Sequence, residues 1–200
     1  VIEEFRKQSI PVVLVNNYLD MDGLVCISAD HYGGAVQATE YLCKLGHCKI
    51  GLLSGRFSPQ VSEARIEGFV KTLAKYDIPV DDRFIADIEP ALEDGEEIMT
   101  RMLREVDRPT AFFCTNDTIA AGAMKAVTRA GLRVPEDIAI IGFDDSYISR
   151  VVEPELTTVR IDAAKMGCLA MQTLFDLIAG MPVEKAHIQI PTELIVRGTA

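Results

Sequence analysis

Short, almost continuously apolar runs alternate along this chain with longer segments in which apolar residues recur at helical spacing. The apolar runs predict strands over 11–15, 24–27, 49–53, 83–88, 111–115, 138–143, 157–160 and 187–190. Runs that are apolar at nearly every position are typical of strands covered on both faces, as in parallel sheets. Strands that alternate with single helices connect by parallel crossovers. The pattern therefore predicts an α/β fold with parallel sheets flanked by helices.

The segments between these runs have apolar residues three and four positions apart, which is the spacing of one face of a helix. They predict helices near 35–45, 66–73, 98–106, 120–127 and 166–177. Gly131 and Gly180 each follow such a segment and are expected to cap it, because glycine readily adopts the left-handed conformation that ends many helices. Residues 1–8 resemble the tail of a helix that leads into the first strand.

Short polar side chains follow two of the predicted strands directly. Asn116 and Asp117 come after one strand, and Asp144 and Asp145 come after another. The carboxyl ends of parallel strands meet at one edge of the sheet, where ligands of open α/β folds bind. These four side chains are therefore candidates for a binding site.

Helix capping is the alternative role for the same residues. Asp144 could cap a helical turn at 146–151, Asn116 could cap the helix that follows it, and Asp30 could cap the helix near 35. Two adjacent carboxylates are more than a cap requires, so Asp144 is favoured as a ligand residue. For Asn116 the two roles are compatible, because a cap orients the side chain and leaves the amide nitrogen available.

Arg65 opens the helix near 66–73 and is expected to lie off its apolar face, close to the end of the strand at 49–53. A guanidinium offers five donors in a rigid fork, which suits the adjacent hydroxyls of a sugar ring. A surface salt bridge to Glu63 or Glu67 is the alternative. A sugar also needs an apolar platform, for which Phe57 is the candidate aromatic residue in a chain without tryptophan.

Composition narrows the function classes. The chain has 200 residues, 48% of them hydrophobic, and a formal net charge of -10. A strongly acidic chain is a poor match for the phosphate backbone of nucleic acids. Its apolar runs are shorter than the ~20 residues that cross a bilayer, so we expect no membrane association. Five cysteines without a CxxC pair favour small buried side chains in a reducing, cytoplasmic setting over a metal site.

Several motifs in order along the chain resemble the effector-binding domain of the lactose-repressor/galactose-repressor (LacI/GalR) family of bacterial transcription regulators. They are Asp30-x-x-Gly33-Gly34, Leu45-Gly46-His47-x-x-Ile50, Arg65-x-x-Gly68-Phe69, Phe113-Cys114-Thr115-Asn116-Asp117, Val134-Pro135-Glu136-Asp137-Ile138 leading to Gly142-Phe143-Asp144-Asp145, Pro154-x-Leu156-Thr157-Thr158-Val159, and Leu194-Ile195-x-Arg197. The resemblance implies a two-lobed, periplasmic-binding-protein-like fold. It also places the principal ligand arginine of the family at Arg65.

The family layout implies how the chain is divided. Residues 1–43 and 162–187 would form an incomplete N-terminal lobe, and residues 44–161 and 188–200 a C-terminal lobe. The strands that cross between the lobes near Cys43, Arg160, Ile161 and Ile188 would form the hinge. A DNA-binding headpiece and the opening elements of the first lobe would precede residue 1, so the chain is expected to be cut at its front.

The resemblance implies an effector-sensing domain that is not an enzyme and needs no cofactor or metal. A small-molecule effector, expected to be a sugar, would bind to Asp30, Phe57, Arg65, Asn116 and Asp144. Lobe closure in a homodimer would then be coupled to operator DNA through the headpiece. Ile161 and Val61 depart from residue types frequent in the family, so the identity of the effector stays open.

Two other classes are compatible with an α/β chain. A secreted sugar-binding protein of an uptake system would share the two-lobed architecture, although unpaired cysteines weigh against an oxidising compartment. A doubly wound enzyme is disfavoured, because the sequence contains no GxxxxGK[ST], GxGxxG or GxSxG motif. Asp144 and Asp145 could act as an acid/base pair, but no nucleophile accompanies them at a recognisable spacing.

Overall fold

The chain forms two compact units in a computed structural model that describes residues 2–19, 21–182 and 186–200. The smaller unit comprises residues 1–30 and 162–191, and the larger one comprises residues 31–161 and 192–200. The chain therefore passes between the units at 30/31, 161/162 and 191/192. Both units contain the parallel sheets that the apolar runs predict.

The larger unit is built on a six-stranded sheet with the order β4-β3-β5-β6-β7-β9. Its strands are β3 (Ile50–Gly55), β4 (Ile85–Ile88), β5 (Ala111–Cys114), β6 (Ala139–Asp144), β7 (Thr157–Arg160) and β9 (Glu193–Ile195). All neighbouring strands run parallel except β7 and β9, which are antiparallel. The carboxyl ends of β3, β5 and β6 therefore lie at the same edge, as the sequence predicts.

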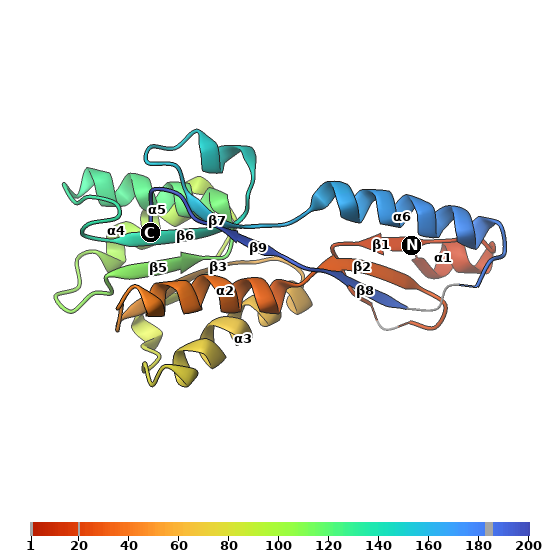
Figure 1. The fold of residues 1–200 in the computed structure, drawn as a ribbon, viewed down its shortest axis with the longest axis horizontal. Helices are drawn as coiled ribbons and strands as arrows, with labels where there is room; N and C mark the ends of the chain where they lie inside the picture. The colour runs from red at the N-terminus through yellow and green to blue at the C-terminus, as the bar shows by residue number, and fades with distance from the viewer. Residues whose placement is uncertain (1, 20, 183–185) are drawn as a thin grey trace. The chain divides into compact units, whose positions relative to one another are not determined.

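Helices cover both faces of this sheet (Figure 1). They are α2 (His31–Lys44), α3 (Pro59–Lys75), α4 (Leu92–Met102) and α5 (Asp117–Arg129), with short 3-10 helices η1 (Asp82–Phe84) and η2 (Tyr147–Arg150). One apolar core joins the sheet to α2 and α3 and includes Phe69 and Phe113. A second core on the opposite face joins it to α4 and α5 and includes Met99 and Phe112. Covering on both faces explains why the strands are continuously apolar.

Two glycines allow the backbones of α4 and α5 to approach closely. A Cβ added to Gly122 would lie 2.1 Å from the Leu92 carbonyl oxygen, and one added to Gly95 would lie 2.4 Å from the Ile119 carbonyl oxygen. Both neighbours are backbone atoms, which cannot rotate away as a side chain could. The packing of these helices therefore requires glycine at both positions.

The smaller unit contains a three-stranded parallel sheet with the order β1-β2-β8. Its elements are α1 (Ile2–Lys7), β1 (Val13–Val15), β2 (Val25–Ala29), α6 (Ala163–Ile178) and β8 (His187–Ile190). Ile27 on the central strand is completely buried. The predicted cap Gly180 follows α6 with φ +71°, and Gly131 follows α5 with φ +74°.

Two of the three expected crossings between the lobes, at 43/44 and 187/188, are wrong. Residues 31–43 belong to the larger unit, because α2 packs against α3 and buries Ala38 and Leu42 in the core that they share. Residues 188–191 belong to the smaller unit, because β8 pairs with β2. Cys43 therefore lies near the end of a helix within the larger unit, away from the three chain crossings.

The remaining hinge candidates lie at different distances from the crossings. Ile161 is the last residue before the crossing at 161/162, and Arg160 precedes it at the end of β7. Ile188 is inside β8, paired with Ile27, and precedes the crossing at 191/192 by a few residues. The strand predictions correspond to β1 to β8, whereas β9 was not predicted. Only its pairing with β7 identifies this short, partly exposed segment as a strand.

Candidate functional site

A buried arginine lies at the carboxyl-end edge of the large sheet. Arg65, in α3, is only 2% exposed, in contrast to the expected position off the core face. Its Nη1 donates to the Thr115 carbonyl oxygen at the end of β5, and its Nη2 lies 3.2 Å from Asp144 Oδ1 at the end of β6. The structure thus brings Arg65 and Asp144 together from segments 79 residues apart. The alternative of a surface salt bridge is wrong for Glu67, because Arg65 is buried and pairs with Asp144, whereas Glu67 pairs with Lys71.

Aromatic rings surround the guanidinium. Arg65 Cζ lies 3.8 Å from the centroid of the Phe143 ring and 5.1 Å from that of Phe57. The negative faces of these rings attract a cation and partly replace the water that burial removes. Burial still lowers the pKa of Arg65, and Asp144 acts in the opposite direction. Even a lowered arginine pKa leaves the group protonated at neutral pH.

His31 is a member of this site that sequence reasoning missed. Its Nδ1 accepts from Arg65 Nε at 3.3 Å and lies 3.2 Å from Nη2. Burial and the charge of Arg65 lower the pKa of His31 to about 3, so the ring is neutral and can act as an acceptor. The only signal in the sequence is that His31 follows Asp30. Its role depends on α2 and α3 lying side by side, which a single sequence does not show.

Asp144 combines an unusual backbone with a partly exposed carboxylate. Its φ is +108°, and its side chain is 34% exposed although it pairs with Arg65. Burial raises the pKa of Asp144, and the nearby guanidinium opposes that rise. The alternative in which Asp144 caps the next helical turn is wrong, because the N-cap of η2 is Ser146. Asp144 is therefore available for an interaction beyond Arg65.

Asn116 caps α5, as the capping alternative predicts. Its Oδ1 accepts from the Ile119 backbone N–H at 2.8 Å. The neighbouring Asp117 is buried, and its carboxylate accepts from Thr158 Oγ1 at 2.5 Å and from the Ser146 backbone N–H at 2.6 Å. Burial raises the pKa of Asp117 to about 6 despite these two hydrogen bonds. Gly142 leaves room for this carboxylate, because an added Cβ would lie 2.4 Å from Asp117 Oδ1.

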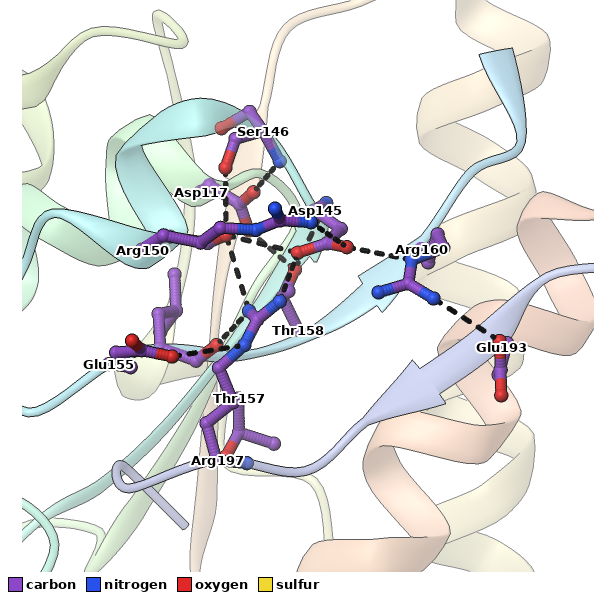
Figure 2. A network of polar contacts seen from close by, with 12 residues as sticks. Asp117, Asp145, Ser146, Arg150, Glu155, Thr157, Thr158, Arg160, Glu193 and Arg197 are labelled. Atoms are coloured by element: carbon purple, nitrogen blue, oxygen red, sulfur yellow. Dashed lines mark hydrogen bonds and ion pairs between the residues drawn. The ribbon is translucent and has the colours of Figure 1, made fainter. Parts of the chain in front are cut away.

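The Asp145 side chain lies among Arg150, Arg160 and Arg197 (Figure 2). We call this set the Asp145 cluster, and it consists of Asp145, Ser149, Arg150, Arg160, Glu193 and Arg197. Burial tends to raise the pKa of Asp145, but hydrogen bonds from Arg197 and Arg160 outweigh it and lower that pKa. The two adjacent aspartates therefore have different environments. Asp144 meets one buried arginine, whereas Asp145 is enclosed by several.

Asp30 belongs to the smaller unit, where its backbone N–H donates to the Ile190 carbonyl oxygen at 2.9 Å. Arg65, Asn116, Asp144 and Phe57 all belong to the larger unit. The structure therefore places Phe57 and Asp144 beside Arg65, with Asn116 one residue beyond the Thr115 carbonyl that Arg65 contacts. Asp30 is the last residue before a chain crossing.

A cavity of about 750 Å³ lies elsewhere in the larger unit, between α4 and α5. Glu96 lines it and pairs there with Arg129, and with Lys125 at 2.7 Å. Helices α4 and α5 cover the face of the sheet opposite α3, so this cavity is separate from the site around Arg65.

The strand-end site supplies charged donors and acceptors rather than reactive groups. A fixed guanidinium and a partly exposed carboxylate can recognise hydroxyl groups, because the guanidinium only donates and the carboxylate only accepts. Cys114 is buried near this edge, and burial raises its thiol pKa well above the ordinary value, so it is no nucleophile. Among the described residues, no group of three or more His, Cys, Asp or Glu side chains could hold a metal ion. Within that same part of the chain, no helix is long and apolar enough to cross a membrane.

Residues 39–200 match the model of a periplasmic binding protein-like domain family. The HTH-type transcriptional repressor PurR of Pasteurella multocida is 36% identical over 191 residues, which cover 94% of this chain and 57% of PurR. A LacI-family regulatory protein from Chloroflexus aggregans superimposes with a TM-score of 0.92 at 31% identity, over 99% of this chain and 71% of that one. A LacI-family regulator from Enterococcus faecium, solved with bound ribose, gives a TM-score of 0.90 at 27% identity, over 98% and 73% of the two chains.

The fold and these comparisons define a periplasmic-binding-protein-like domain of the regulatory type. The chain belongs to the LacI family of transcriptional regulators and comprises part of the effector-binding domain of such a protein. It spans a little more than half the length of the curated relatives it matches.

Proposed function

We propose that this chain senses a small polyhydroxylated effector, most simply a sugar, which binds to Arg65 and Asp144. The observation that carries this function is a buried, aromatic-lined guanidinium beside a carboxylate that is still 34% exposed. The guanidinium donates to hydroxyl oxygens, and the carboxylate accepts from hydroxyl hydrogens. Neither group is needed for a helix cap or for an apolar core. Their pairing at the strand ends supports binding rather than a purely structural role.

Three further residues complete the proposed site. Phe57 lies beside Arg65 and offers an apolar ring for the C–H face of a sugar. Asn116 uses its Oδ1 as a cap, which leaves its amide nitrogen to donate to a hydroxyl. Asp30 is proposed as a ligand residue from the family resemblance alone.

The regulatory part of the function rests on the relatives. They are repressors, which favours a transcription regulator over the alternative of a sugar-binding protein for uptake. The relative solved with bound ribose supports a sugar as the effector class. We accordingly propose a cytoplasmic homodimer that contacts operator DNA through a headpiece outside these 200 residues. An enzymatic role finds no support in the chemistry of the site.

Effector binding would control DNA binding only if the effector has different affinities for two conformations. The chain crossings are where a change between such conformations would be accommodated, and Arg160 and Ile161 adjoin one of them. Ile188 remains a hinge proposal with a weaker basis, because it is paired within β8. A typical coupling of this kind amounts to ~1 to 3 kcal/mol.

A thermal-shift screen tests the proposed effector class. The chain is screened against pentoses, hexoses, disaccharides, sugar phosphates and purines, because a ligand at 100 times its dissociation constant stabilises the folded state by ~2.7 kcal/mol. A sugar that raises the melting temperature is then titrated against Asp144→Asn. The matched control is Asp137→Asn, which removes a carboxylate paired with Arg133 on the surface. Stabilisation by purines alone would refute the proposed class of effector. Equal sugar affinity in both variants would refute the proposed site.

A further inference from the structure

The turn at the end of β6 contains two consecutive residues with positive φ, the left-handed region of backbone conformation. Asp144 has φ +108° and Asp145 has φ +50°. Such conformations are strained for residues other than glycine, so they persist only where the surroundings fix them. The turn that presents Asp144 to Arg65 must therefore be held by other groups.

Two backbone amides of this turn are held by neighbouring side chains. The Ser146 N–H donates to Asp117 Oδ2 at 2.6 Å, and the Asp145 N–H donates to Thr158 Oγ1 at 3.4 Å. Thr158 in turn donates to Asp117 Oδ1 at 2.5 Å. These contacts hold the backbone on the side of α5 and β7.

The side chain of Asp145 holds the turn from within the Asp145 cluster. The side chain is 3% exposed, and its Oδ2 accepts from Arg160 Nε at 2.7 Å. Its Oδ1 accepts from Arg197 Nη2 at 2.5 Å and from Ser149 Oγ at 3.1 Å. Both carboxylate oxygens are thus occupied, which leaves Asp145 unsuited to bind an effector itself.

Arg160 connects this carboxylate to two segments that leave the larger unit. It ends β7, lies opposite Asp144 in the parallel register, and precedes the crossing at 161/162 by one residue. Its Nη1 lies 3.6 Å from Glu193 Oε2, in the strand that begins just after the crossing at 191/192. Figure 2 shows Arg160 between Asp145 and Glu193, in contact with both.

We propose that Asp145 is a positioning residue, which fixes the turn of Asp144 and connects it through Arg160 to the segments at the chain crossings. This role rests on the proposed function, in which Asp144 contacts the effector. An effector that shifts Asp144 would then alter the contacts of Arg160 at the end of β7. An anion site is a poorer explanation of the arginines, because Asp145, Glu155 and Glu193 balance the charges of Arg150, Arg160 and Arg197.

Amide hydrogen exchange, followed by NMR on the 200-residue chain, tests this role without an effector. The variants are Asp145→Asn and Arg160→Gln, the second of which keeps the buried carboxylate if the first fails to fold. The control is Arg150→Gln, because Arg150 is 59% exposed and lies 3.5 Å from the same oxygen that Arg160 contacts at 2.7 Å. Arg160→Lys is the conservative variant.

We expect the amides of Asp145 and Ser146 to exchange about tenfold faster in both variants, as the loss of a charged hydrogen bond predicts. Amides of β3, which lies across the sheet, should keep their rates, and Arg160→Lys should recover most of the protection. The double variant should exchange no faster than Asp145→Asn alone, because both residues act through one ion pair.

Unchanged exchange of the two turn amides in both variants would overturn the positioning role, as would an equal acceleration in Arg150→Gln. Neither outcome depends on which effector binds. The proposed function fails instead when Asp144→Asn leaves sugar affinity unchanged. The two failures are therefore distinguishable.

Discussion

Asp117 should make the stability of the larger unit depend on pH, and Asp117→Asn should remove that dependence. The carboxyl group is buried beneath the turn of Asp144 and accepts two hydrogen bonds. Asparagine has nearly the same shape, and its oxygen can accept from the Ser146 N–H. Its NH₂ group can donate to Thr158 Oγ1, because a hydroxyl can accept as well as donate. The substitution therefore removes the titration with little change in packing.

The magnitude follows from the pKa of Asp117. Burial raises this pKa from an ordinary 3.8 to about 6 in the folded state. Below about pH 3 both states are protonated, and the group favours neither. As the pH rises from about 4 to 6, the unfolded state loses its proton more readily, so the folded state is progressively disfavoured. Each unit of difference between the folded and unfolded pKa corresponds to ~1.4 kcal/mol, so at neutral pH the ionised Asp117 lowers the free energy of unfolding by about 3 kcal/mol.

Urea unfolding followed by circular dichroism, at intervals between about pH 3 and pH 7.5, measures this effect. The difference in free energy of unfolding between Asp117→Asn and the parent protein should increase by about 3 kcal/mol over that range, in favour of the variant. Other titrating groups, such as His31 and Asp144, are present in both proteins and largely cancel. Thr158→Val is the matched control, because it removes one donor to Asp117 and should extend the pH-dependent window upward.

A constant difference between the two proteins across this range would refute the reasoning. It would mean that the hydrogen bonds from Ser146 and Thr158 compensate fully for burial, so that Asp117 keeps an ordinary pKa. A decrease in the relative stability of the variant with rising pH would contradict even the direction of the shift.

Three further predictions concern affinity, packing and coupling. Arg65→Ala should abolish most effector affinity, since each charged hydrogen bond is worth ~1.5 to 3 kcal/mol. It should also lower the melting temperature, because Arg65 is buried. Affinity that isothermal titration finds unchanged would exclude Arg65 from the site. Gly122→Ala should destabilise the larger unit by ~1 to 3 kcal/mol in urea unfolding, because its Cβ would meet the Leu92 carbonyl oxygen, and an unchanged midpoint would contradict that contact. In the full-length protein, Ile161→Pro should keep part of the effector affinity, because Asp144 is unchanged, yet lose effector-dependent DNA binding in gel shifts. A normal effector response would exclude this crossing as the hinge.

The sequence alone predicted the elements whose signal is local. Apolar runs predicted β1 to β8. The signal is strongest for β2, β3, β5 and β6, which are buried and therefore carry apolar side chains at most positions. The strand-end rule predicted that Asn116 and Asp144 would lie at one edge, and the motifs predicted the LacI family. Capping by Asn116 was also foreseeable, because Asn is favoured at helix N-termini.

Tertiary structure decided everything that depends on contacts between distant segments. His31 accepts from Arg65 only because α2 lies against α3, and no sequence pattern around His31 predicts that contact. The different roles of Asp144 and Asp145 follow from the different partners of their side chains in a turn with positive φ, which residue type does not reveal. The unit boundary at 30/31 rather than 43/44 likewise reflects where α2 buries its apolar face. The spacing of apolar residues predicts that one face of a helix is buried, but only the folded chain determines which sheet that face packs against.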